Sequence, residues 1–158
     1  MERGLRLLEK AEESVSTILM VVAFGIIFAH IIGRYVLGAP IYFSEEVARY
    51  AFIWACMIGA SIVFRTDGHT KVDYFVSFLP PTAQVLLDIL RNVIIIIFLG
   101  VVVATGTALA FKMRTVPTAA LEWSWAYVYA SAPVGALLMI VNALRHIARK
   151  AGVLRGAR

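Results

Sequence analysis

Residues 34–73 read RYVLGAPIYFSEEVARYAFIWACMIGASIVFRTDGHTKVD. Residues 50–64 in this stretch carry no formally charged side chain. Charged residues lie on both sides of it, namely Glu45, Glu46 and Arg49 before it and Arg65, Asp67, Lys71 and Asp73 after it. A helix on the surface of a soluble protein carries polar residues along one whole face. Charge confined to the two ends is typical of a helix that crosses a bilayer, so this stretch predicts a membrane protein.

The composition of the whole chain agrees with this interpretation. Of its 158 residues, 61% are hydrophobic and 16% are charged, and the mean hydropathy is +0.83. Typical soluble domains are about 45–50% apolar and about 25% charged. The net charge of +5 comes from Lys and Arg residues at the rims of apolar runs, which favours a topological role over nucleic-acid binding. Cys56 is the only cysteine, so an internal disulfide and CxxC-type sites are excluded.

Four apolar segments are long enough to cross a bilayer, which needs about 20 residues. We predict an all-α integral membrane protein with transmembrane helices over about residues 15–37, 44–64, 82–111 and 124–147. The first apolar run continues to Leu37 and is followed by Pro40, which argues against a cleaved signal peptide. We therefore expect an uncleaved first span.

Short interfacial helices are expected beside these spans. Residues 1–14 alternate charged residues with Leu, which suits either a short helix on the membrane surface or a solvated approach to the first span. The amphipathic stretch from Val72 to Leu79 is too short to span and should lie at the interface. Residues 148–158 form a basic tail.

Several local signals mark the ends and bends of the predicted helices. Ser44 is a plausible N-cap for the second span, and Glu45 precedes Arg49 by four residues, the spacing of a helical ion pair. Because Glu45 and Glu46 are adjacent, their side chains should diverge on a helix. Pro133 should kink the fourth span by leaving the Tyr129 carbonyl without its helical donor.

The distribution of Lys and Arg predicts the orientation. Ten of these residues lie at the two termini or in the 65–82 connection: Arg3, Arg6, Lys10, Arg65, Lys71, Arg145, Arg149, Lys150, Arg155 and Arg158. Four lie on the other side: Arg34, Arg49, Lys112 and Arg114. The positive-inside rule then places both termini in the cytoplasm.

The sequence offers no catalytic constellation. It lacks a Ser/His/Asp arrangement, an HExxH motif and a glycine-rich phosphate loop, and the Glu45–Glu46 pair is a poor metal site. We therefore expect no catalytic, cofactor-binding or metal-binding residues. A haem b anchor ligated by His30 is an alternative, but His69 is in a loop and His146 is at the far end of the fourth span, so neither should reach the same iron. A hydrogen bond to a neighbouring helix is the favoured role for His30.

The ordered motifs of the chain resemble the small membrane subunit of TRAP (tripartite ATP-independent periplasmic) transporters, the DctQ-like family. The resemblance covers about residues 15–147 and includes the same plan of four spans. Phe43 stands where the family often has Trp, a mild departure. The residues that carry the resemblance are Arg34, Tyr35, Pro40, Ser44, Glu45, Glu46, Arg49, Trp54, Gly59, Ala60, Arg65, His69, Val72, Asp73, Leu79, Pro80, Pro117, Ala120, Leu121, Trp125, Tyr127, Pro133 and Gly135.

The resemblance implies a scaffold subunit in the cytoplasmic (inner) membrane of a bacterium or archaeon. Its partners would be a large membrane subunit and a periplasmic substrate-binding protein, besides membrane lipids, in uptake of an organic acid. Uptake would be driven by sodium, and the sodium and substrate sites would lie in the large subunit. A stand-alone membrane sensor or assembly factor is the further alternative.

Two sets of residues are candidates for contact within such a complex. Small residues that allow close helix packing, within the chain or against the large subunit, are Gly59, Ala60, Ser61, Gly100, Ala104 and Ala108. Charged residues of the outer rim that could steer the binding protein, or merely anchor the helices at the interface, are Glu45, Glu46, Arg49, Lys112, Arg114 and Glu122.

Overall fold

The computed structural model describes residues 2–39, 41–65 and 80–156. Within these ranges the chain is all-helical except for one isolated β-bridge, and no strand is present. The helices are α1 (Glu2–Tyr35), α2 (Ser44–Arg65), α4 (Pro81–Lys112), α5 (Ala126–Tyr129) and α6 (Ser131–Gly156). Four segments of these helices are long and apolar enough to cross a membrane: Leu7–Tyr35, Ser44–Arg65, Leu86–Lys112 and Ala126–Ala148. The predicted four-span, all-α fold class is confirmed.

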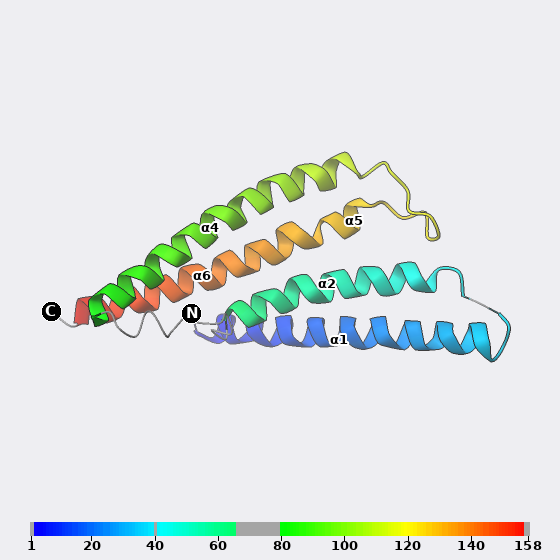
Figure 1. The fold of residues 1–158 in the computed structure, drawn as a ribbon, viewed down its shortest axis with the longest axis horizontal. Helices are drawn as coiled ribbons and strands as arrows, with labels where there is room; N and C mark the ends of the chain where they lie inside the picture. Colours follow the sequence, from blue (N-terminus) through cyan, green and yellow to red (C-terminus); the bar gives the residue numbers. More distant parts are fainter. Residues whose placement is uncertain (1, 40, 66–79, 157–158) are drawn as a thin grey trace.

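The helices form a single layer rather than a four-helix bundle with a central core. α1 packs on α2, α2 packs on α6, and α6 packs on α4, so that α1 and α4 are the two edges of the layer (Figure 1). The membrane-spanning parts of the edge helices have few buried residues, whereas α2 and α6 have several. Both broad faces of the layer are therefore open to lipid or to a partner protein.

The first helix is longer than the predicted span. Residues 2–14 continue α1 without a break, so they do not form a separate helix lying on the membrane surface. The cause is visible in the contacts of this segment, because Glu9 and Glu13 pair with basic residues of α2 and α6 and hold the first turns against these helices. The predicted interfacial stretch from Val72 to Leu79 lies outside the described residues.

A turn after Tyr35 ends α1. Gly38 has a φ of +62°, a left-handed conformation that suits glycine. The Ala39 amide donates to the Gly33 carbonyl at 2.9 Å, which closes the end of α1. The turn brings His30, near the end of α1, beside Ser44 at the start of α2.

The central contact of the layer is the α2–α6 seam. A Cβ atom on Gly135 of α6 would lie 2.9 Å from the backbone oxygen of Met57 in α2, so the two backbones approach too closely for any other residue. Nearer the chain termini, Asn142 of α6 donates to the hydroxyl of Ser61, which is fully buried, at 3.0 Å. In a bilayer, close backbone approach and interhelical hydrogen bonds are what hold helices together.

The fourth span is interrupted where the sequence predicts a kink. α5 ends at Tyr129 and α6 begins at Ser131, which places the break about one turn before Pro133. Proline has no backbone N–H to donate to the carbonyl four residues earlier, and its ring clashes with that carbonyl. The start of α4 also agrees with the sequence, because Pro81 is its first residue and Pro80 is extended.

Candidate functional site

The candidate site is the end of the layer away from the chain termini. There the connection between α4 and α5 lies beside the start of α2 (Figure 1). The two adjacent acids at the start of α2 point in different directions, as predicted, because successive helical residues are about 100° apart. One acid contacts the α4–α5 connection and the other contacts α1.

Glu46 binds the α4–α5 connection through its backbone. Its carboxylate accepts hydrogen bonds from the amides of Ala120 at 2.7 Å and Leu121 at 3.1 Å. It also accepts a hydrogen bond from the hydroxyl of Tyr50, one turn further along α2. Carboxylates that accept from N–H groups form stronger hydrogen bonds than neutral acceptors do. Glu46 is therefore a clasp between α2 and a segment more than seventy positions away in the chain.

The connection held by Glu46 is a closed turn. The Thr118 amide donates to the Trp123 carbonyl at 2.7 Å, and the Trp125 amide donates to the Val116 carbonyl at 3.1 Å. At the tip, Glu122 has a φ of +55°, an uncommon conformation for a residue other than glycine. Trp123 and Glu122 are exposed, so the turn presents a fixed, partly apolar surface at this end of the protein.

Aromatic residues join the same turn to α2. The Trp54 indole donates to the Tyr127 carbonyl at 3.0 Å, and the Tyr50 and Trp125 rings meet edge-on with centroids 6.2 Å apart. Trp123, Trp125, Tyr127 and Tyr129 form an aromatic belt at the start of the fourth span, as expected where a helix enters the bilayer interface. The structure adds that part of this belt packs between helices.

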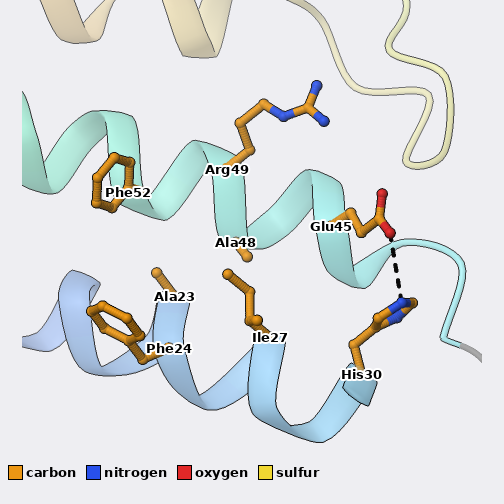
Figure 2. Close-up of a pocket in the computed structure, with 8 residues that line it drawn as sticks. All are labelled: Ala23, Phe24, Ile27, His30, Glu45, Ala48, Arg49 and Phe52. Carbon is orange, nitrogen blue, oxygen red and sulfur yellow. Dashed lines mark ion pairs between the residues drawn. The ribbon is translucent and has the colours of Figure 1, made fainter. Parts of the chain in front are cut away.

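Glu45 turns toward α1 instead. Its carboxylate lies 3.6 Å from Nε2 of His30, as Figure 2 shows. On the other side of the imidazole, Nδ1 is 2.6 Å from the Ser44 hydroxyl and 3.1 Å from the Ile41 carbonyl. The favoured sequence interpretation of His30, a hydrogen bond to a neighbouring helix, is thus confirmed.

Two local predictions for this end are wrong. Ser44 begins α2, but its hydroxyl donates to the Ile41 carbonyl and contacts His30, so it does not cap the helix through its side chain. The predicted Glu45–Arg49 ion pair is not among the ion pairs of the described residues. Both differences have one cause, since His30 on α1 supplies a competing partner for each side chain.

The remaining charged residues of the rim are exposed. Arg49 extends from the side of α2 away from α1 (Figure 2). Lys112 ends α4, and Arg114 follows it in the turn toward the α4–α5 connection. Glu45 and Glu46 thus differ from these three basic residues, because both acids contact other segments of the chain.

The two small-residue patches occupy different environments. Gly59 faces Ser16 of α1, whose hydroxyl would lie 3.6 Å from a Cβ at that position, and Ser61 is buried against α6. Ala60 is half-buried beside them. In α4, by contrast, Gly100, Ala104 and Ala108 are all exposed, and a Cβ on Gly100 would meet nothing within 4 Å. The first patch packs α2 within the chain, whereas the α4 stripe faces outward.

Sequence reasoning missed an ionic cluster at the opposite end, near the chain termini. Arg65, at the end of α2, pairs with Glu13 and lies 3.6 Å from Glu9. Glu9 also lies 3.6 Å from Arg145 of α6. The signal in the sequence is the spacing of Glu9 and Glu13, one helical turn apart, together with a predicted topology that places both arginines on the same side.

The described residues contain no group of three or more His, Cys, Asp or Glu side chains that could hold a metal ion. His30 lies near the end of α1, and His146 lies beside the ionic cluster at the other end of the layer. The two imidazoles are separated by most of the length of a span, as the predicted topology requires. His69, the third histidine, is outside the described residues.

Comparison with known proteins gives consistent matches. The family model for the DctQ component of tripartite ATP-independent periplasmic transporters matches residues 23–152. The chain is 25% identical over 142 residues to the sialic acid TRAP transporter small permease protein SiaQ of Vibrio cholerae, covering 90% of this chain and 82% of that protein. It is 26% identical over 152 residues to a TRAP transporter small permease protein of Haemophilus influenzae, covering 94% and 93% of the two chains.

A third relative is much longer. The chain is 26% identical over 140 residues to the sialic acid TRAP transporter permease protein SiaT of Haemophilus influenzae, which covers 86% of this chain but only 22% of that protein. The described fold, with four membrane-length helices, suits a permease subunit. The family match extends over most of the sequence, and this protein therefore belongs to the DctQ component family of TRAP transporters, whose members are transporter permease subunits and not enzymes.

Proposed function

We infer that this chain scaffolds a large permease subunit in the binding-protein-dependent uptake of an organic acid. Uptake would be coupled to sodium, with the sodium and substrate sites in the large subunit. The observation that carries the proposal is the single-layer fold of a chain in this family. The spans of the two edge helices have few protein neighbours within the chain, so these helices are available to pack against a partner subunit.

The longer relative supports a large permease partner. In SiaT the region similar to this chain is one part of a protein more than four times its length, so the remainder is held next to it by the polypeptide itself. The exposed α4 stripe of Gly100, Ala104 and Ala108 is a suitable contact for that partner, because small residues let two helix backbones approach closely. The names of SiaQ and SiaT support an organic acid as substrate, since sialic acid is one.

A second partner is a periplasmic substrate-binding protein. The turn held by Glu46 and the exposed charges Arg49, Lys112 and Arg114 lie at the end of the layer away from both termini. With both termini in the cytoplasm of a bacterium or archaeon, this end faces the periplasm. A rigid turn suits docking, because little conformational freedom is lost when it is bound.

The test is reconstitution of uptake. Cells that express a large TRAP permease subunit and a substrate-binding protein should accumulate an organic acid, such as sialic acid, only when this chain is also present. Uptake should depend on a sodium gradient and stop when sodium is replaced by potassium. Uptake at full rate without this chain would contradict the scaffold role. Uptake that persists without sodium would contradict the coupling alone.

A further inference from the structure

A groove runs between α1 and α2 from their connected ends toward the middle of the membrane (Figure 2). Its volume is about 490 Å³, within the range of cavities that bind small molecules. The floor and walls are apolar and come from both helices: Ala23, Phe24, Ile27, Ala48 and Phe52. Ala23 and His30 are seven positions apart on α1, so the apolar part is roughly 10 Å deep, about two thirds of one leaflet of the hydrocarbon core.

Charged residues lie at only one end of this groove. Glu45 and Arg49 are one helical turn apart on α2; His30 faces Glu45 from α1, whereas the Arg49 guanidinium extends away from α1 (Figure 2). Both α2 side chains are exposed, with Glu45 about two-thirds accessible. The groove thus combines a cation and an anion at the level of the headgroups with an apolar slot beneath them. This is the polarity of a zwitterionic phospholipid.

The hydrogen bonds of His30 sharpen the match to the headgroup. Carbonyl oxygens only accept, so the bond between Nδ1 and the Ile41 carbonyl requires a proton on Nδ1. In a neutral imidazole Nε2 is then an acceptor, and among the described residues it has no hydrogen-bond partner although it is buried. It faces the Glu45 carboxylate, another acceptor, at 3.6 Å. Two facing acceptors need either a second proton on His30 or a donor from outside the chain.

We propose that this groove binds phosphatidylethanolamine from the leaflet opposite the chain termini. Its primary ammonium group inserts between Glu45 and Nε2 of His30 as the exposed Glu45 side chain swings outward, and its phosphate pairs with Arg49 once that exposed side chain turns toward α1. An acyl chain lies between Phe24 and Phe52. A primary ammonium has three N–H donors and can satisfy both acceptors together. The quaternary ammonium of phosphatidylcholine has none, so the two lipids provide a sharp comparison.

A lipid suits the groove better than a helix of a partner protein does. The charged residues lie at one end only, as the polar atoms of a lipid do, and the two charges of opposite sign match a headgroup that has both. A transmembrane helix placed here would cover Arg49 and Glu45 without an evident counter-charge for each, and burying unpaired charge is costly.

The test is native mass spectrometry of the full-length protein, delipidated in detergent and mixed with synthetic lipids of identical acyl chains. The wild type should retain phosphatidylethanolamine at least about tenfold more strongly than phosphatidylcholine, the effect expected for a charge-assisted hydrogen bond. It should also prefer phosphatidylethanolamine to phosphatidylglycerol, which has no ammonium group.

Three substitutions separate the contributions of Glu45 and Arg49 to lipid binding from a general effect of charge. Glu45→Gln should bring the preference for phosphatidylethanolamine over phosphatidylcholine close to one. Arg49→Gln should weaken both lipids alike, because both contain the phosphate. Arg114→Gln is the matched control, an exposed arginine at the same end but outside the groove, and should change neither. Circular dichroism would verify that all three variants keep their helices.

Equal retention of the two lipids by the wild type would overturn the proposal and would favour a doubly protonated His30 paired with Glu45. A preference that Glu45→Gln leaves intact would overturn it as well. If the preference is present in the isolated chain but absent when the chain is bound to its large permease subunit, the groove is a protein contact and the lipid assignment fails.

Discussion

The carboxylate of Glu46 on α2 accepts a hydrogen bond from the backbone amide of Ala120, 74 residues later in the chain, at 2.7 Å. The same carboxylate accepts from the next amide, that of Leu121. These two bonds hold the backbone of the turn, in addition to the bond that the Trp123 amide donates to the Thr118 hydroxyl within it. The candidate docking turn is therefore held by a residue of a different helix.

Replacing Glu46 should loosen this turn. Glu46→Gln keeps the shape but removes the charge, and we expect a loss of about 1 kcal/mol, which corresponds to roughly fivefold faster amide exchange at residues 120 and 121. Hydrogen exchange followed by mass spectrometry measures this rate. Glu45→Gln is the control, because Glu45 contacts α1 and should leave these amides unchanged. Equal exchange in wild type and Glu46→Gln would mean that the clasp contributes nothing.

The α2–α6 seam should not tolerate an added methyl group at Gly135. The new Cβ would lie 2.9 Å from the Met57 oxygen, so Gly135→Ala forces the helices apart at a cost of about 1–3 kcal/mol. The expected result is a lower midpoint of thermal unfolding in detergent. Gly25→Ala is the control, since a Cβ there meets nothing within 4 Å and alanine favours a helix. An equal midpoint for both variants would contradict the close approach.

The exposed stripe on α4 should matter for assembly and not for folding. Gly100→Leu places a large side chain where a partner helix would pack, and we expect much less co-purification with the large permease subunit. Gly25→Leu is the matched control, because Gly25 is also exposed but lies in α1, on the other edge of the layer. If Gly100→Leu retains the partner as well as Gly25→Leu does, the stripe faces lipid.

The ionic cluster near the chain termini should stabilise the fold by a measurable coupling. Arg65 is largely buried and contacts Glu13, so Arg65→Met and Glu13→Gln should each destabilise the protein, and the double variant should lose less than the sum. A double-mutant cycle should give a coupling free energy of about 0.5–3 kcal/mol. Arg91→Met is the comparison, because the more exposed Arg91–Asp88 pair within α4 should contribute below about 0.5 kcal/mol. If the losses of stability in the two single variants simply add up in the double variant, the contact between Arg65 and Glu13 does not stabilise the fold.

The orientation can be tested directly. The positive-inside rule places the connection between α1 and α2 in the periplasm. Alkaline phosphatase inserted after Ala39 should therefore be active, and green fluorescent protein inserted at the same position should not fluoresce. The same reporters fused at the carboxyl end should give the reverse pattern. A fluorescent insertion after Ala39 would invert the proposed topology and place the turn held by Glu46 in the cytoplasm.

Much of the protein follows from local properties of the sequence. Apolar runs longer than a bilayer is thick must become helices, since lipid leaves no other partner for backbone N–H and C=O groups. For this reason the four spans, the start of α4 at Pro81 and the break before Pro133 could all be predicted from residues close together in the chain. The divergence of Glu45 and Glu46 follows in the same way from the helical repeat alone.

What only the tertiary structure decided is which helix lies beside which. The side of a membrane helix that faces lipid and the side that faces another helix are both apolar. The hydrophobicity of a span therefore does not specify which helix lies beside it. The clasp from Glu46 to Ala120 and the extension of α1 toward Arg65 depend on contacts between residues more than fifty positions apart. The single layer depends on which pairs of whole helices pack together. The sequence by itself determined four membrane helices and their approximate positions in the chain. The tertiary structure determined that Glu46 binds the distant turn, that Glu45 faces His30, and that the α4 stripe is left open for a partner.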